Sequence, residues 1–405
     1  MGRIFFLASH YCVGESGGGH GVEYRLHLAN KKYNLFNQDA IYIFGDRVIK
    51  GNSETGKFFE QKDMPKQSEC RVRLKKYIPS IFRIMKMEKM YTHLDEYLSQ
   101  LDSEFHFTDD DIYICHDFRI ARAFVRKYSF HKCAMVHHMQ GSIYFEWHAD
   151  TGLNSEMMRK YFNSIFSEIA QNVKYLCFPS KGTEESLLNS EPLLTQVVSR
   201  TERKYLYNGV NCPEVDPKDM PDWIVDINKF EGYKIATVAN LNAAKAVERI
   251  PEYLYHLKLA GVKFKWILVG NGVQADEVQR KIEEYGLIDF VIWKKSNVLH
   301  AELMKLFSVT DFYILFHKYS IFDLSTLEAM HYGNIPILTP VGGNNEVIID
   351  GNGLFVSDFS DTISFLNLIN QDCIDKLRES NKRIQRENFD DKAFLQRYVD
   401  LCDNF

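Results

Sequence analysis

Short, fully apolar runs separated by segments of helical period constrain the fold of this chain more than any other feature. A first series lies at residues 4–8, 41–44, 112–115, 134–137 and 175–178, and a second at 235–238, 266–269, 291–293, 312–315, 335–338 and 355–356. Strands that are apolar throughout and alternate with helices form parallel sheets that are covered on both faces. We therefore predict an α/β chain with two doubly wound parallel sheets.

The pattern restarts after the segment "NCPEVDPKDMPDWIVDINKFEGY", which is rich in proline and acidic residues. Such a composition is typical of a linker. A length of 405 residues suits two domains of about 150 to 200 residues each. The predicted parts are an N-terminal Rossmann-like domain at 1–212, a linker at 213–232, a C-terminal domain at 233–389 and a final helix at 390–405 that joins the N-terminal domain. Ligands of such sheets bind beyond the carboxyl ends of the strands, so we expect the two domains to face a cleft.

The bulk composition excludes several classes of protein. A net charge of -5 argues against a nucleic-acid binder, which carries a basic excess. The eight cysteines form neither a C-x-x-C pair nor a Cys/His cluster, which argues against a structural zinc site and a disulfide framework. The opening residues lack the long apolar core of a secretory signal, and no apolar stretch is long enough to span a bilayer. We expect a cytoplasmic protein.

Residues 66–93 combine a local positive excess with apolar side chains. The basic residues include Arg71, Arg73, Lys75, Lys76, Arg83, Lys86 and Lys89, and the apolar ones include Ile78, Ile81, Phe82, Ile84 and Met85. A basic amphipathic stretch can lie on anionic lipid. A solvated helix face is the reading that such a charge run favours, and peripheral contact with a membrane surface through this segment is the alternative.

Two glycine-rich turns follow apolar runs. In "SHYCVGESGGGHGVEYR" the glycines, which include Gly18 and Gly19, let the backbone approach a ligand and open a helix with free N–H groups. The spacing is not G-x-G-x-x-G, so a dinucleotide site is not favoured, and a flexible turn is the alternative. Gly270-Asn271-Gly272 repeats the pattern after residues 266–269, either as a ligand loop or as an ordinary turn.

The segment "YSIFDLSTLEAMHYGNIPILTPVGG" places a carboxylate, a helix start and a double glycine close together. The amides near residues 324–327 would open a helix, whose dipole favours a diphosphate. Glu328 could accept both hydroxyls of a ribose, although a first-turn glutamate is also ordinary dipole compensation. Lys245 follows the first strand of the second half and could reach an anionic group, or could be a surface lysine.

Several segments of the sequence together resemble one known family of enzymes. The segments "STLEAMHYGNIPILTPVGGNNEVI", "TVANLNAAK", "ILVGNG" and "YLYNGVN", with "VHHMQGS" and "CFPSKGT" in the N-terminal half, resemble the retaining GT-B glycosyltransferases of family four. The likeness is strong from about residue 232 to residue 356. It implies two Rossmann-like domains that face a cleft, with a nucleotide-sugar bound by the C-terminal one and the acceptor on the side of the N-terminal one.

The resemblance also assigns residues. It places nucleotide-sugar binding at Gly18, Gly19, Asn240, Lys245, Gly270, Asn271, Trp293, Leu324, Ser325, Thr326, Leu327 and Glu328. Glu328 matches the ribose-binding glutamate and Lys245 the diphosphate lysine. The family's first glutamate is replaced here by Ser320 and its arginine by Asn240. The family's histidine at the donor sugar corresponds to His138 or is replaced by Gln140, and Asp323 is a candidate for contact with sugar hydroxyls.

The function implied by this resemblance is transfer of a hexose or deoxyhexose, with retention, from a UDP- or GDP-linked donor. The acceptor is a saccharide, a lipid-linked saccharide or a glycoprotein in surface-glycan synthesis. No cofactor and no metal are expected. Two alternatives remain open: a catalytically inactive adaptor or chaperone subunit, and a nucleotide-sugar epimerase on the same fold.

Overall fold

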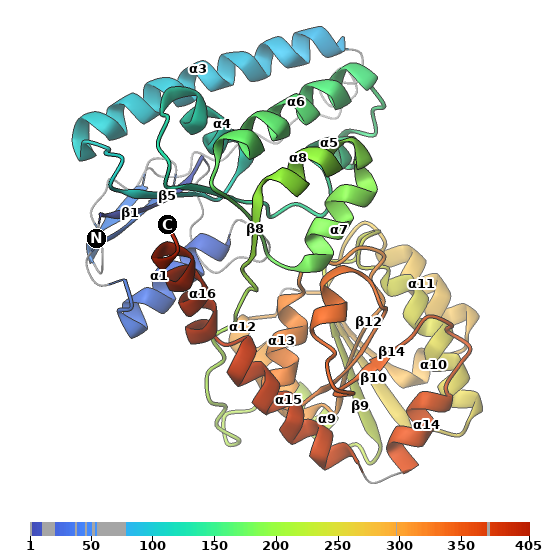
Figure 1. The fold of residues 1–405 in the computed structure, drawn as a ribbon. Helices are drawn as coiled ribbons and strands as arrows, with labels where there is room; N and C mark the ends of the chain where they lie inside the picture. Colours follow the sequence, from blue (N-terminus) through green and yellow to red (C-terminus); the bar gives the residue numbers. More distant parts are fainter. Residues whose placement is uncertain are drawn as a thin grey trace. The chain divides into compact units, whose positions relative to one another are not determined.

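The computed structural model describes residues 2–9, 21–36, 39–44, 47–50, 53–54, 78–296, 298–370 and 373–405. The chain divides into two compact units, each built around one sheet (Figure 1). The first unit comprises Met1–Tyr207 and Phe394–Phe405, and the second comprises Asn208–Ala393. Within the described ranges, no helix is long and apolar enough to cross a membrane.

The first unit holds a sheet with the strand order β4-β3-β2-β1-β5-β6-β7-β8. The strands are β1 (Ile4–Ala8), β2 (Ala40–Phe44), β3 (Arg47–Lys50), β4 (Ser53–Glu54), β5 (Ile112–Cys115), β6 (Cys133–Val136), β7 (Tyr175–Phe178) and β8 (Glu202–Tyr205). The helices are α1 (Val22–Tyr33), α3 (Ser80–Phe105), α4 (Phe118–Lys127), α5 (Ile143–Thr151), α6 (Glu156–Asn172), α7 (Lys181–Ser190), α8 (Thr195–Arg200) and α16 (Asp391–Asp403). Pairing is parallel except where β3 meets β2 and β4.

Successive residues of each central strand face opposite sides of this sheet, because the side-chain period of a strand is two. Phe5 and Leu7 join the core beneath α3, α4 and α6, whereas Ile4 and Phe6 join the core beneath α1 and α16. The last helix of the chain thus completes the first unit (Figure 1). Apolar strands that are buried on both faces explain the continuous apolar runs of the sequence.

The second unit holds an all-parallel sheet with the order β11-β10-β9-β12-β13-β14. The strands are β9 (Tyr233–Val238), β10 (Phe264–Val269), β11 (Val291–Lys294), β12 (Phe312–Leu315), β13 (Ile335–Leu338) and β14 (Leu354–Phe355). The helices are α9 (Asp222–Asn228), α10 (Ile250–Leu259), α11 (Ala275–Glu284), α12 (His300–Val309), α13 (Leu324–His331), α14 (Ile363–Asn370) and α15 (Ile374–Asn388). The chain leaves β9 toward β10 and returns to β12 on its other side, and such a switch point opens a crevice at the carboxyl ends of the strands.

The α/β, doubly wound class predicted from the apolar runs is confirmed, and each run coincides with a strand to within a few residues. The strand β8 was not predicted because its sequence, ERKY, is charged; it forms the edge of its sheet, where only one neighbour, β7, needs to be paired. The short strands β3 and β4, which extend the opposite edge, were missed as well.

The linker at 213–232 stays a prediction; in the structure these residues fall within the second unit, which begins at Asn208. Within it, α9 packs Ile224 and Ile227 against β10 and α12. These two isoleucines are three residues apart and therefore share one helical face. The prolines and acidic residues favour a loop before α9, but the segment still packs against the second unit.

Candidate functional site

A buried charge cluster stands at the carboxyl edge of the second sheet, where the loop after β9 meets the loop after β12. The ammonium of Lys245 pairs with the Asp323 carboxylate and lies 3.1 Å from His317 Nε2. The Lys245 side chain is 25% exposed, whereas those of Asp323 and His317 are buried. His317, which follows the end of β12 by two residues, was not predicted from the sequence.

Asp323 is saturated with donors. Its Oδ2 accepts hydrogen bonds from Thr326 N at 3.0 Å, from Thr326 Oγ1 at 2.8 Å and from Tyr313 OH at 3.3 Å, while Oδ1 faces Lys245. A carboxylate offers about four lone-pair sites. The contact of Asp323 with sugar hydroxyls stays a prediction; in the structure this carboxylate caps α13 and holds Lys245.

The electrostatics of the cluster follow from burial and proximity. Burial alone would raise the pKa of the Asp323 carboxyl, but the nearby Lys245 ammonium and the His317 ring hold that pKa well below its usual range. Burial, reinforced by Lys245, lowers the pKa of His317, so its ring is neutral at pH 7. One positive and one negative charge remain, and only the Lys245 side chain reaches solvent appreciably.

The first turn of α13 is only partly available to a ligand. Thr326 N already donates to Asp323, and the Leu327 side chain lies in the core. The amides of Leu324 and Ser325 donate no hydrogen bond within the described part of the chain, and both residues are partly exposed. The predicted row of free amides at 324–327 is thus reduced to these two.

Glu328, on the same helix, lies close to solvent but already has a partner. Its Oε1 is 2.8 Å from His300 Nε2, at the start of α12. The Glu328 side chain is mostly buried and the His300 side chain is half exposed. His300 was not predicted from the sequence, and it holds one of the two oxygens of the Glu328 carboxylate.

Ser320 and the double glycine are packed together behind α13. The Ser320 hydroxyl is buried and has no hydrogen-bond partner among the described residues, while its carbonyl accepts Gly343 N at 3.0 Å. A Cβ on Gly342 would lie 2.0 Å from Ser320 O, and one on Gly343 would lie 2.0 Å from Ile321 O. Gly342 also has a φ of 50°, so glycine is required at this turn for both reasons.

The carboxyl ends of β9, β10 and β11 bring the remaining candidates of the second unit together. Trp293 Nε1 donates to Gly270 O at 2.9 Å, and Asn271 O accepts an amide from the loop after β9 at 3.0 Å. Gly270 has a φ of 137°, and a Cβ there would lie 1.9 Å from Ala239 O. Asn240 is exposed and stands against Gly272 in the same group.

In the first unit, the two alternatives for the donor-sugar histidine have different surroundings. His138, just after β6, is partly exposed, and its Nε2 lies 3.1 Å from His116 Nδ1, so that one ring nitrogen donates to the other. His116 in turn stacks on Tyr398 of α16. The backbone N–H of Gln140 donates a hydrogen bond to Glu146 Oε1 at 2.6 Å, and the backbone carbonyl of Gln140 accepts one from the Ser186 hydroxyl. Of these two alternatives, His138 is the one with an imidazole ring.

Two predicted features fall wholly or partly on the undescribed segments. Gly18 and Gly19 lie outside the described residues. So do residues 66–77 of the basic segment, whereas residues 78–93 form the start of α3 and the turn before it.

Comparison with known proteins gives a family match for most of the second unit. Residues 219–390 match the family model described as "Glycosyl transferases group 1". Residues 219–390 are a group 1 glycosyltransferase domain. The matched residues span nearly all of the second unit, including Lys245, Asp323 and Glu328. No similar protein was found among the curated proteins.

The fold of this glycosyltransferase is shared by solved structures of low identity. Sucrose-phosphate synthase from Thermosynechococcus elongatus is 15% identical with a TM-score of 0.67, over 100% of this chain and 99% of that one. HepE from Anabaena, solved with UDP and glucose, is 14% identical with a TM-score of 0.62, over 100% of both chains. A glycosyltransferase from Rickettsia africae is 14% identical with a TM-score of 0.62, over 100% and 98%. The expected GT-B fold is confirmed.

Proposed function

We propose that this glycosyltransferase moves a hexose or deoxyhexose, with retention, from a UDP- or GDP-linked donor to a saccharide, lipid-linked saccharide or glycoprotein acceptor in surface-glycan synthesis. The observation that carries the proposal is the meeting of Lys245, the first turn of α13 and Glu328 at the carboxyl edge of the second sheet. The bound UDP and glucose of the Anabaena neighbour support this class of donor.

In this proposal each part of the donor has a partner. The diphosphate lies against the amides of Leu324 and Ser325, where the helix dipole favours negative charge, and beside the exposed end of Lys245. Glu328 accepts the ribose hydroxyls with the oxygen that His300 leaves open. The buried, unpartnered hydroxyl of Ser320 suits a hydroxyl of the donor sugar, because a buried polar group without a partner is costly.

The chemistry requires charge stabilisation more than a nucleophile. As the glycosidic bond breaks, negative charge grows on the departing diphosphate, and prearranged donors are most effective at that point. Lys245 and the two amides are such donors. Asp323 keeps Lys245 in place, so it acts as a positioning residue. For retention, the acceptor hydroxyl attacks from the face that the diphosphate leaves, and its proton passes to a phosphate oxygen. No metal ion enters this route.

Product analysis tests the proposal. The protein is incubated with UDP- and GDP-sugars and candidate saccharide acceptors, and the anomeric configuration of the product is determined by NMR. A product with the configuration of the donor supports the proposal, and an inverted product contradicts retention. Donor turnover in the absence of acceptor, with a changed sugar, would identify an epimerase instead.

One observation favours a second function, that of a catalytically inactive adaptor. Asp323 puts a carboxylate beside the proposed diphosphate position and neutralises Lys245, and Asn240 carries no charge where the family has an arginine. A protein that binds nucleotide without turnover, or binds none, would fit this second function. The NMR assay therefore needs a parallel calorimetric titration with each nucleotide-sugar.

We also propose that the protein works at the cytoplasmic face of a membrane through the start of α3. Ile78, Ile81, Phe82 and Met85 recur at helical spacing and are between 44% and 59% exposed. Lys86 and Lys89 are exposed on the same stretch. An apolar face flanked by lysines suits anionic lipid, since the side chains enter the headgroup layer while the charges stay outside it.

Vesicle binding tests the membrane proposal. The parent protein should sediment with vesicles containing phosphatidylserine, and a Phe82→Ser/Met85→Ser variant should not. Leu193→Ser, which alters another exposed apolar residue of the first unit, is the matched control and should sediment as the parent does. Equal sedimentation of the parent and the double variant, or none with any vesicle, would refute membrane contact.

A further inference from the structure

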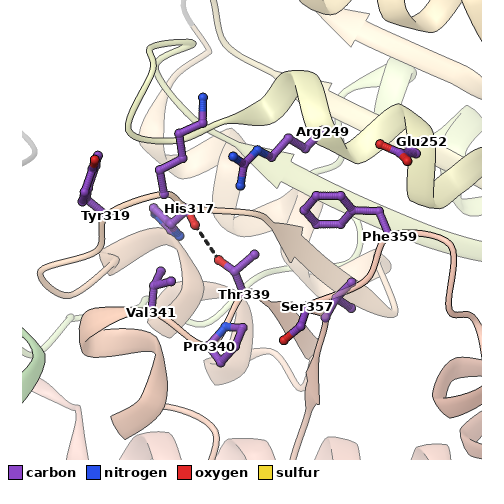
Figure 2. Close-up of a pocket in the computed structure, with 11 residues that line it drawn as sticks. Arg249, Glu252, His317, Tyr319, Thr339, Pro340, Val341, Ser357 and Phe359 are labelled. Carbon is purple, nitrogen blue, oxygen red and sulfur yellow. Dashed lines mark hydrogen bonds between the residues drawn. The ribbon is translucent and has the colours of Figure 1, made fainter.

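A pocket of about 650 Å³ lies at the carboxyl edge of the second sheet, on the side of β13 and β14. Its walls include Arg249 and Glu252 around the start of α10, Lys318 and Tyr319 after β12, and Ser357 and Phe359 after β14 (Figure 2). The volume falls within the range of small-molecule sites, which runs from about 300 to 1,000 Å³. None of these side chains belongs to the donor site proposed above.

The pocket and the donor candidates occupy different parts of the sheet edge. Gly270 and Trp293 lie where β10 and β11 end, whereas the pocket is lined from the segments after β9, β12, β13 and β14. The segments after β9 and β12 also carry Lys245 and Asp323, but neither of these side chains lines the pocket. His317 stands between the two: its ring contacts Lys245, and its carbonyl accepts the Thr339 hydroxyl at 2.7 Å on the pocket side (Figure 2). The pocket is therefore a neighbour of the donor site and not a part of it.

Arg249 is the feature that indicates a ligand. Its guanidinium makes no hydrogen bond or ion pair with any residue in the described part of the chain. It lies 5.7 Å from the centre of the Phe359 ring, and that ring stacks on the buried Phe316. Figure 2 shows the guanidinium among the labelled pocket residues, beside Phe359. An arginine held by stacking, with its donors open, suits a planar carboxylate or a phosphate.

The other charged groups of the pocket restrict the class of ligand that it can bind. Lys318 Nζ is 3.2 Å from Glu248, so it adds little net charge. Glu252 has no hydrogen-bond partner in the described ranges, and its carboxylate would repel a second anionic group but accept hydroxyl donors. The Phe359 ring and Pro340 offer apolar surface between them. One cation, one hydroxyl acceptor and an aromatic wall fit a sugar that carries a single anionic group.

We propose that this pocket binds a hexose bearing a phosphate or a carboxylate, whose anionic group pairs with Arg249 and whose hydroxyls donate to Glu252. The ligand is either a free sugar phosphate or the acidic end of a glycan. The site does not depend on the proposed transfer reaction, because it shares no charged side chain with the donor site.

Calorimetric titration of the full chain tests this site. Glucose 6-phosphate and methyl glucuronide are the anionic probes, and glucose and inorganic phosphate are the neutral and sugar-free controls. We expect saturable binding of at least one anionic probe, tighter than that of either control. The tighter of the two identifies the source, free sugar phosphate or glycan end. Glucose binding as tightly as both anionic probes would overturn the role of Arg249, and absence of binding by both would overturn the site.

Substitutions separate this site from the donor site. Arg249→Met keeps the aliphatic stem against Phe359 but removes the charge, and it should weaken the anionic probe roughly 10- to 100-fold. Arg280→Met removes an exposed arginine of α11 and should leave binding unchanged. Glu328→Gln should also leave binding of the anionic probe unchanged. The presence of saturating UDP should leave that binding unchanged as well. Equal weakening by Arg249→Met and Arg280→Met, or displacement of the probe by UDP, would refute a separate site.

Discussion

At the scale of single residues, the chemistry of the second unit depends on which side chains neutralise one another. Lys245 and Asp323 are 78 positions apart in the chain but form an ion pair, so neither acts as an isolated charge. The sequence predicted Lys245 as a diphosphate ligand because it matches a family motif. It could not predict the pairing, since the motif carries no information on which carboxylate reaches the lysine. The saturated oxygens of Asp323 follow only from the structure.

His137 provides a pH test at the same scale. Its ring is fully buried and bonds Gly141 O at 2.8 Å, and burial lowers its pKa from 6.5 to about 4. The unfolded chain therefore binds a proton between those values while the folded chain does not, so stability is present above pH 6.5 and is lost as the pH falls. Between pH 7 and pH 5 this residue should cost about 2 kcal/mol of unfolding free energy.

Chemical denaturation at the two pH values measures this loss. His137→Gln, which keeps a donor for Gly141, should remove about 2 kcal/mol of the decrease between pH 7 and pH 5. His131→Gln, at an exposed histidine of the same unit, is the control and should retain the full decrease. A His137→Gln variant with the pH dependence of the parent would show that the buried ring is not the cause.

At the scale of elements, one buried arginine of α4 links α3 to α6, in addition to the apolar core that these helices share. Arg122 is 5% exposed, donates to Glu88 of α3 at 2.8 Å and to Glu168 of α6 at 2.9 Å, and lies 4.5 Å from the centre of the Tyr91 ring. Burial opposes the charge of Arg122, but its hydrogen bonds to the two glutamates raise its pKa overall. This contact orients the helix whose first turn carries the exposed apolar side chains.

Removing the arginine should loosen α3. Arg122→Met leaves the two glutamates without their shared buried partner and should lower the free energy of unfolding by about 3–5 kcal/mol. Arg126→Met, which removes the neighbouring, 38% exposed partner of the same glutamates, should cost less than about 1 kcal/mol. Urea denaturation of both variants measures the difference. Equal losses would mean that burial of Arg122 does not add to the ion pair.

Elements were predictable where their pattern is local. The central strands are apolar on both faces, so their apolar runs predict them. The strand β8 is polar and forms by pairing with its neighbour β7, so its own residues did not predict it. The isoleucines of α9 were hidden in a segment whose prolines suggested a linker. Glu328 and the turn at Gly342 were found through their motif, whereas His317, His300 and Arg249 matter only through residues far away in the chain.

At the scale of the whole molecule, two doubly wound units and a group 1 domain define a GT-B glycosyltransferase. We propose that the donor nucleotide binds the second unit at the switch point beside β9 and β12, and that an anionic sugar binds the pocket lined from the segments after β9, β12, β13 and β14. The first unit contributes the His138–His116 pair and the exposed start of α3. The central claim among these is the nucleotide site.

Calorimetric titration with UDP and GDP tests that claim most directly. The parent should bind at least one of the two nucleotides, and Glu328→Gln should weaken that binding roughly 10- to 100-fold through the loss of charge-assisted hydrogen bonds to the ribose. Glu379→Gln, at an exposed glutamate of α15, should bind as the parent does. If Glu328→Gln binds the nucleotide as tightly as the parent, the nucleotide does not lie where this account puts it.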